Sequence, residues 1–178
     1  MRLGFWRGFP ALAFLALLLT GCASAPSTES AAASARNRAL VLAFHAAVER
    51  GDFDAAERML APGYRHYVVS ADGFRPLPWA DFRKGNVAAR AAVLAAFPDW
   101  KNTPTRVVAE GDFVSVLVLG KGTHTGSFSG ESPSGRVVAM PITVTHEVHD
   151  GMIFADWEVV DTGPLMRAIA PDKPPQAD

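Results

Sequence analysis

The stretch Asp150 to Asp161, DGMIFADWEVVD, contains the signals that decide the fold. It opens with Asp-Gly, which favours a tight hairpin turn because these two residues tolerate the positive φ that such a turn needs. A strand-like run follows, in which successive side chains point to opposite faces. One face is apolar and ends in a carboxylate: Ala155, Trp157, Val159 and Asp161. Asp161 is therefore either a strand-end capping residue or a buried acid with a chemical role.

The opposite face of the same predicted strand contains Asp156 and Glu158, together with Phe154 and Val160. If the face of Trp157 lies against the core, strict alternation directs these two carboxylates to solvent. The sequence therefore predicts that Asp156 and Glu158 are solvated charges.

The first residues have the features of a secretory signal, because two arginines precede an apolar run over residues 9–19. That run is too short to span a bilayer comfortably. The tetrapeptide LTGC at 19–22 resembles the bacterial lipobox, whose cysteine is lipidated and becomes the mature N-terminus. Cys22 is also the only cysteine. We expect a lipoprotein signal peptide over residues 1–21 and anchoring through Cys22 on the periplasmic side of a membrane; the alternative is a plain signal peptide.

Composition and charge limit the remaining possibilities. Removing two of the 17 basic residues with the signal peptide leaves 15 against 18 acidic residues, a net charge of −3. No basic patch favours nucleic acid. Residues 22–35 are small and polar and predict a flexible tether, residues 36–170 predict one domain, and residues 171–178 predict a disordered tail.

The periodicity of apolar residues changes along the domain from helical to alternating. Helices are predicted over 36–50, 54–60 and 79–97, a loop over 72–78, and strands over 64–70, 103–110, 113–125, 136–149 and 152–162. Helices followed by an antiparallel meander predict an α+β fold, with three N-terminal helices packed on a strongly curved antiparallel sheet. Such a cone has an internal pocket in which a ligand would bind.

Several short motifs follow one another in a recognisable order: Tyr64-x-His66, Phe97-Pro98-Asp99, Glu110-Gly111-Asp112, Gly122-Thr123-His124-Thr125-Gly126, Pro133-Ser134-Gly135-Arg136, Asp150-Gly151-x-Ile153 and Trp157-x-x-x-Asp161. This order resembles the SnoaL-like polyketide cyclase (ester cyclase) family of the NTF2-like superfamily, over about residues 36–166. Leu117 stands where family members commonly have arginine, and residues 166–169 differ from the family's Gln-Leu-Gly.

The resemblance implies a cone-shaped α+β fold with an apolar pocket. It also implies an acidic residue in that pocket, acting as general acid/base in an intramolecular aldol ring closure without a metal or organic cofactor. The matching position is Asp161, and burial in an apolar pocket would raise its pKa toward neutrality. His66 and His124 are the candidate orienting or oxyanion-stabilising partners. The structural alternatives are a strand-end carboxylate and two packing histidines.

Tyr64, His146 and Trp157 are predicted to line the pocket, with core packing as the alternative. His146 and His149 are three residues apart in a strand, so they point to opposite faces and cannot bind one ion. A site made of His66, His124 and His146 has no supporting spacing, and we expect no metal and no cofactor.

The sequence thus predicts an exported, lipid-anchored SnoaL-like domain that binds a small hydrophobic molecule, with cyclase- or isomerase-type chemistry at Asp161. The alternative is a non-catalytic periplasmic binding or assembly lipoprotein. Expected partners are the hydrophobic ligand, the membrane through the lipid on Cys22, and a second copy in a homodimer.

Overall fold

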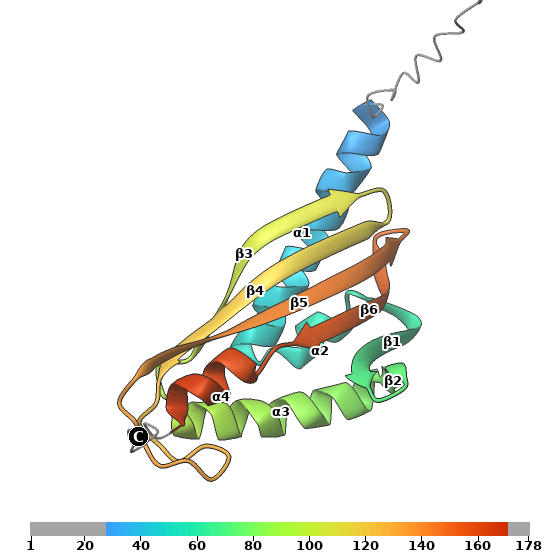
Figure 1. The fold of residues 1–178 in the computed structure, drawn as a ribbon. Coiled ribbons are helices and arrows are strands. Elements are labelled where there is room, and N and C mark those ends of the chain that lie inside the picture. Colours follow the sequence, from blue (N-terminus) through green and yellow to red (C-terminus); the bar gives the residue numbers. More distant parts are fainter. Residues whose placement is uncertain (1–27, 171–178) are drawn as a thin grey trace, which may run out of the picture.

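The computed structural model describes residues 28–170. Cys22, the predicted signal peptide and the predicted tail lie outside the described residues. Figure 1 shows helices gathered against one curved, mixed sheet of six strands in the order β2-β1-β6-β5-β4-β3. The elements are α1 (Thr28–Arg50), α2 (Phe53–Glu57), β1 (Leu60–Ser70), β2 (Gly73–Pro78), α3 (Trp79–Ala96), β3 (Lys101–Glu110), β4 (Phe113–Thr123), β5 (Val137–His149), β6 (Met152–Val160) and α4 (Gly163–Ile169).

Helix α1 begins at Thr28, so residues 28–35, predicted as tether, are helical instead. The alanines of this stretch are strong helix formers, which accounts for the longer helix. The helix ends at Gly51, whose φ of 75° suits the left-handed conformation of a helix terminus. No helix among residues 28–170 is long and apolar enough to cross a membrane.

The sheet differs from the predicted antiparallel meander at one pair, because β1 and β6 run parallel. The chain reaches β6 only after crossing α3 and the β3–β5 meander, and this long connection permits parallel pairing. Strand β2 was predicted as a loop because of its glycine and prolines. It lies at the sheet edge, where a proline without an N–H is tolerated.

The inner face of the sheet carries the main core. One side of α1, formed by Val41, Phe44 and Ala47, is fully or almost fully buried. It packs with the even-numbered valines of β4 and with Val148 and Ile153 of the neighbouring strands. A second cluster lies where the C-terminal end of α3 meets α4 and the start of β5, around Phe97, Trp100 and Leu165.

The outer face of the sheet is more open. Leu117 and Leu119 of β4 and Val159 of β6 are exposed there, with 36–45% of their surface accessible. The expected homodimer has such a face available and stays a prediction.

Candidate active site

A β-bulge in β6 decides which residues enter the site. Val148 of β5 pairs with Ile153, but the preceding residue Glu147 pairs with Ala155, so Phe154 is an extra residue in β6. One extra residue reverses the alternation of side chains from that point onward. Ile153 and Asp156 consequently lie on the same inner face, both almost completely buried. The predicted parity of this strand is therefore wrong.

The bulge moves Asp156 and Glu158 inward and moves Trp157 outward. Asp156 and Glu158, predicted to be solvated, line a cavity between α1 and the sheet. Trp157, predicted to line the pocket, instead stacks on Tyr67, with ring centroids 5.3 Å apart and planes 7° from parallel. It is not among the residues that line either cavity.

Asp161 lies beyond the end of β6 and is exposed, so the prediction that it belongs to the buried face is also wrong. Its Oδ1 accepts a hydrogen bond of 2.9 Å from the backbone N–H of Gly163, at the start of α4. Its own N–H donates to the carbonyl of Pro141. These contacts correspond to the strand-end capping role that the sequence left open.

His124 is fully buried, but the structure does not bring it to His66. It stacks on Phe97 with centroids 5.0 Å apart, and its Nδ1 lies 3.1 Å from the hydroxyl of Ser134 and accepts from the N–H of the same residue. Through these contacts it connects the loop between β4 and β5 to the end of α3. It is absent from the lining of both cavities.

Three neighbouring strands bring together the other polar candidates. In the register of the sheet, Asp156 of β6 stands opposite His66 of β1 on one side and His146 of β5 on the other. All three side chains are buried. Because inner-face residues directly opposite each other lie close together, the row forms without any loop.

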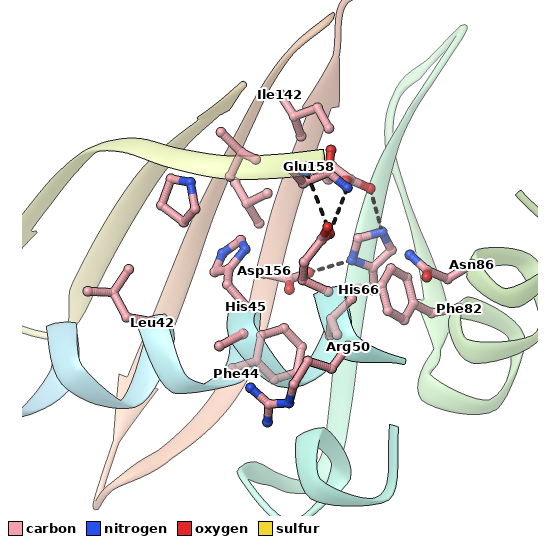
Figure 2. A pocket seen from close by; sticks show the side chains of 17 residues that line it. Leu42, Phe44, His45, Arg50, His66, Phe82, Asn86, Ile142, Asp156 and Glu158 are labelled. Atoms are coloured by element: carbon pink, nitrogen blue, oxygen red, sulfur yellow. Dashed lines mark hydrogen bonds and ion pairs between the residues drawn. The ribbon is translucent and has the colours of Figure 1, made fainter. Parts of the chain in front are cut away.

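Asp156 is the centre of this row. Its Oδ1 lies 2.6 Å from Nδ1 of His66, and its Oδ2 accepts a 2.7 Å hydrogen bond from the hydroxyl of Tyr64. The second nitrogen of His66, Nε2, lies 3.2 Å from Oε2 of Glu158. Figure 2 shows His66 between the two carboxylates at the cavity wall. Tyr64 was predicted to line the pocket and lies behind its wall, holding Asp156.

The two carboxylates determine the charge of His66. Burial alone would lower the pKa of its imidazole, but hydrogen bonds and charge attraction from Asp156 and Glu158 raise it to about 9. Burial raises the pKa of the Asp156 carboxyl, while His66 and Tyr64 act in the opposite direction. Burial, reinforced by the charge of Asp156, raises the pKa of the Tyr64 hydroxyl. At neutral pH, His66 is therefore an imidazolium and Tyr64 a neutral donor.

A second branch leads from Asp156 through His146 to α1. Nδ1 of His146 lies 3.4 Å from Oδ2 of Asp156, and its Nε2 lies 2.9 Å from Nε2 of His45. Burial lowers the pKa of His45 to about 4 and lowers that of His146 well below its ordinary value. Both rings are therefore neutral at neutral pH.

The cavity beside these groups has a volume of about 410 Å³. It lies between α1 and the inner face of the sheet, and its apolar wall includes Leu42, Phe44, Val118, Ile142 and Val144. A second cavity of about 440 Å³ adjoins it under α3 and shares His66, Phe82 and Glu158 with it. Predominantly apolar cavities with a few convergent polar groups are typical of small-molecule sites. No group of three or more His, Cys, Asp or Glu side chains within residues 28–170 has an arrangement that could hold a metal ion.

Comparison with known proteins agrees with this architecture. The model of the SnoaL-like polyketide cyclase family matches residues 38–169, most of the chain. The chain belongs to that family. A search of curated proteins gives no match.

Several solved structures resemble the chain in fold. AclR from Streptomyces galilaeus, a candidate hydroxylase, is 28% identical with a TM-score of 0.62, over 80% of this chain and 87% of its own. IdmH from Streptomyces antibioticus, a candidate polyketide cyclase, is 24% identical with a TM-score of 0.61, over 74% and 96%. A SnoaL-like protein from Jannaschia sp. CCS1 is 23% identical with a TM-score of 0.59, over 83% and 99%. The last two likenesses establish the fold alone.

Proposed function

We propose that this SnoaL-like domain binds a small hydrophobic carbonyl compound and transfers a proton at it, using the unit Asp156–His66–Glu158. The observation that carries the proposal is an imidazolium held between two carboxylates on the wall of an apolar cavity. We assign the acid/base role to this unit and not to Asp161, because Asp161 is exposed and contacts the N-terminus of α4.

The arrangement suits proton abstraction next to a carbonyl. A carbonyl oxygen that displaces Oε2 of Glu158 from Nε2 of His66 would receive a hydrogen bond that strengthens as negative charge develops on it, and it would release the Glu158 carboxylate. Glu158, whose side chain is 26% exposed, is the more accessible of the two carboxylates and would accept the proton from the α-carbon. Asp156, buried behind His66, would keep the imidazole charged and oriented. The resulting enolate is an intermediate suited to either cyclisation or isomerisation.

The second candidate function is binding without chemistry. The cavity supports it, because an unfilled apolar space of this size would hold a ligand whether or not His66 and Glu158 act on it. The two candidates differ in what Glu158 does, so the test concerns that residue.

The test uses 2-decalone, an apolar bicyclic ketone, incubated with the protein in D₂O. Wild type should bind the ketone and incorporate deuterium at its α-carbons, detected by NMR and mass spectrometry. Glu158→Gln should lower the rate about 100-fold while binding persists, because a general base contributes on that order. Asp161→Asn, the matched control on the same stretch, should keep the wild-type rate. Binding without incorporation in wild type would favour the non-catalytic function, and equal rates in wild type and Glu158→Gln would contradict the proposed base.

For location, we propose an exported protein anchored through lipid on Cys22, supported by the lipobox-like residues 19–22 and the preceding apolar run. The mature wild-type protein should carry the mass of the lipid and partition into detergent. Cys22→Ser should abolish both properties. An unchanged mature mass in Cys22→Ser would contradict lipidation and leave the activity proposal unaffected.

A further inference from the structure

His45 is the one histidine of α1, and it enters the cavity from the side opposite the sheet. Its ring lines the cavity beside Phe44, which also belongs to the core (Figure 2). Its Nε2 is occupied by Nε2 of His146 at 2.9 Å. Its other nitrogen, Nδ1, has no hydrogen-bond partner among the described residues. One side of the ring is thus tied to the buried network and the other is available to a ligand.

The contact between His45 and His146 constrains their protons. Two neutral imidazoles whose Nε2 atoms lie 2.9 Å apart form a hydrogen bond only if one carries its proton there and the other presents a lone pair. His146 Nδ1 is buried and makes no hydrogen bond, but it lies 3.4 Å from Oδ2 of Asp156, whose negative charge attracts a proton on that nitrogen and repels a lone pair. The consistent assignment is therefore Nδ1–H on His146 and Nε2–H on His45. It leaves a lone pair on Nδ1 of His45.

We propose that His45 is a second proton acceptor of the cavity, connected through His146 to the carboxylate of Asp156. The proposal rests on the proposed function, since it concerns the same ligand. In the step, an α-C–H bond of the ligand breaks, its electron pair stays on the enolate, and the proton passes to Nδ1 of His45. The Nε2 proton of His45 passes to Nε2 of His146, and the Nδ1 proton of His146 passes to Oδ2 of Asp156 once these two atoms move from 3.4 Å to hydrogen-bond distance. One proton leaves the ligand and one arrives on Asp156, so the step balances.

The surroundings of His45 support this role. The charged groups that line the cavity with His45 are Asp156 and Glu158 of β6, His66 of β1, and its own helix neighbours Glu49 and Arg50. The cavity is thus bounded by Glu158 on the sheet and by His45 on the helix. Two proton acceptors at different places serve reactions in which protons leave or return at different atoms, as cyclisation and isomerisation require. Asp156 links the two, because it contacts His66 through Oδ1 and faces His146 through Oδ2.

The first arm of the test is imidazole NMR on the purified full-length protein labelled with ¹⁵N in histidine, without any ligand. Wild type should show His45 protonated at Nε2 and His146 at Nδ1. Asp156→Asn should shift the ring nitrogens of His45 although the two residues are not in contact, and this effect should vanish when His146→Gln is added. His124 and His149 are the controls and should not move.

If Asp156→Asn fails to fold, Tyr64→Phe replaces it. Losing the tyrosine donor makes Oδ2 of Asp156 a stronger acceptor for His146, and the change should again reach the His45 ring. An Nδ1–H tautomer on His45 in wild type, or a His45 spectrum unmoved by either substitution, would overturn the connection.

The second arm measures deuterium incorporation at the two α-carbons of 2-decalone separately. His45→Gln should lower exchange about tenfold or more at one α-carbon and spare the other, with the opposite preference to Glu158→Gln. Wild-type rates at both positions in His45→Gln would overturn the role of His45. Absence of exchange in wild type would instead refute the proposed function, and the NMR arm would still decide whether the histidines are connected.

Discussion

The two ends of the inner sheet face each bury a histidine completely, yet the two histidines differ in every property that matters for chemistry. His146 lies beside a carboxylate and a second histidine that both line a cavity, although its own ring, predicted to line the pocket, is absent from the lining of both cavities. His124 has an aromatic ring on one side and the hydroxyl and backbone of one serine on the other. Burial and residue type are the same, so the difference lies in the neighbours that the strand register supplies. A buried polar residue indicates a site only when its partners are also ionisable and space for a ligand adjoins them.

The largest expected effect concerns Asp156, the centre of the row that it forms with His66 and His146. Asp156→Ala leaves His66 and Tyr64 without their buried acceptor, and removing one member of a buried charged pair costs about 3–5 kcal/mol of unfolding free energy. Urea denaturation at pH 7 should show this loss, whereas His124→Gln, which removes only contacts to Ser134 and Phe97, should cost about 1–2 kcal/mol. Equal losses in the two variants would mean that Asp156 and His124 contribute equally to stability, and would contradict this comparison.

The next effect is a dependence of the unfolding free energy on pH, which arises from His66 and His45. His66 has a folded pKa of about 9 against an ordinary 6.5, so its contribution is complete below pH 6.5 and is lost as the pH rises to 9. His45, lowered to about 4, contributes fully above pH 6.5 and loses that contribution as the pH falls to 4.

These two histidines should give a maximum of the unfolding free energy near pH 6.5 in denaturation series from pH 4 to 9. His66→Gln should flatten the alkaline limb, and His45→Gln should reduce the acidic limb, to which the lowered pKa of His146 also contributes. His124→Gln is the control and should preserve both limbs. A profile of wild-type shape in His66→Gln would contradict the assigned charge.

The smallest effect concerns Asp161, compared with Asp156 in the same stretch of sequence. Asp161→Ala removes one exposed hydrogen bond to Gly163 and should cost about 1 kcal/mol or less of unfolding free energy. Thermal denaturation beside Asp156→Ala gives the comparison directly. A loss as large as that of Asp156→Ala would show that Asp161 is held by more than its cap.

The sequence was sufficient for the class of fold. Periodicity separated the helices from the strands, and motif order indicated the SnoaL-like family, which the family model confirms. The parallel pairing of β1 with β6 and the edge strand β2 were not predicted, because both depend on which strands meet after a long connection. His66 was selected correctly as an inward residue, since the irregularity of β1 lies before Arg65 and the pairing is regular from there to Val68.

The acidic residues were misassigned for one local reason. Strict alternation from Ile153 leads to Asp161, whereas one extra residue at Phe154 leads to Asp156. A bulge has no strong signature in a single sequence, so parity arguments fail beyond it. The one available signal was that Phe154 and Val160 make the supposedly polar face partly apolar. His45 escaped notice because a histidine beside a helix stripe is usually a packing residue.

The pairing of β1 with β6 also has a consequence for how the protein folds. Tyr64 and Asp156 are 92 positions apart in the chain, and His66 and Asp156 are 90 apart. Contacts between such distant residues require a large loop to close before they stabilise anything. The carboxylate at the centre of the site therefore finds its partners only after most of the chain has been synthesised.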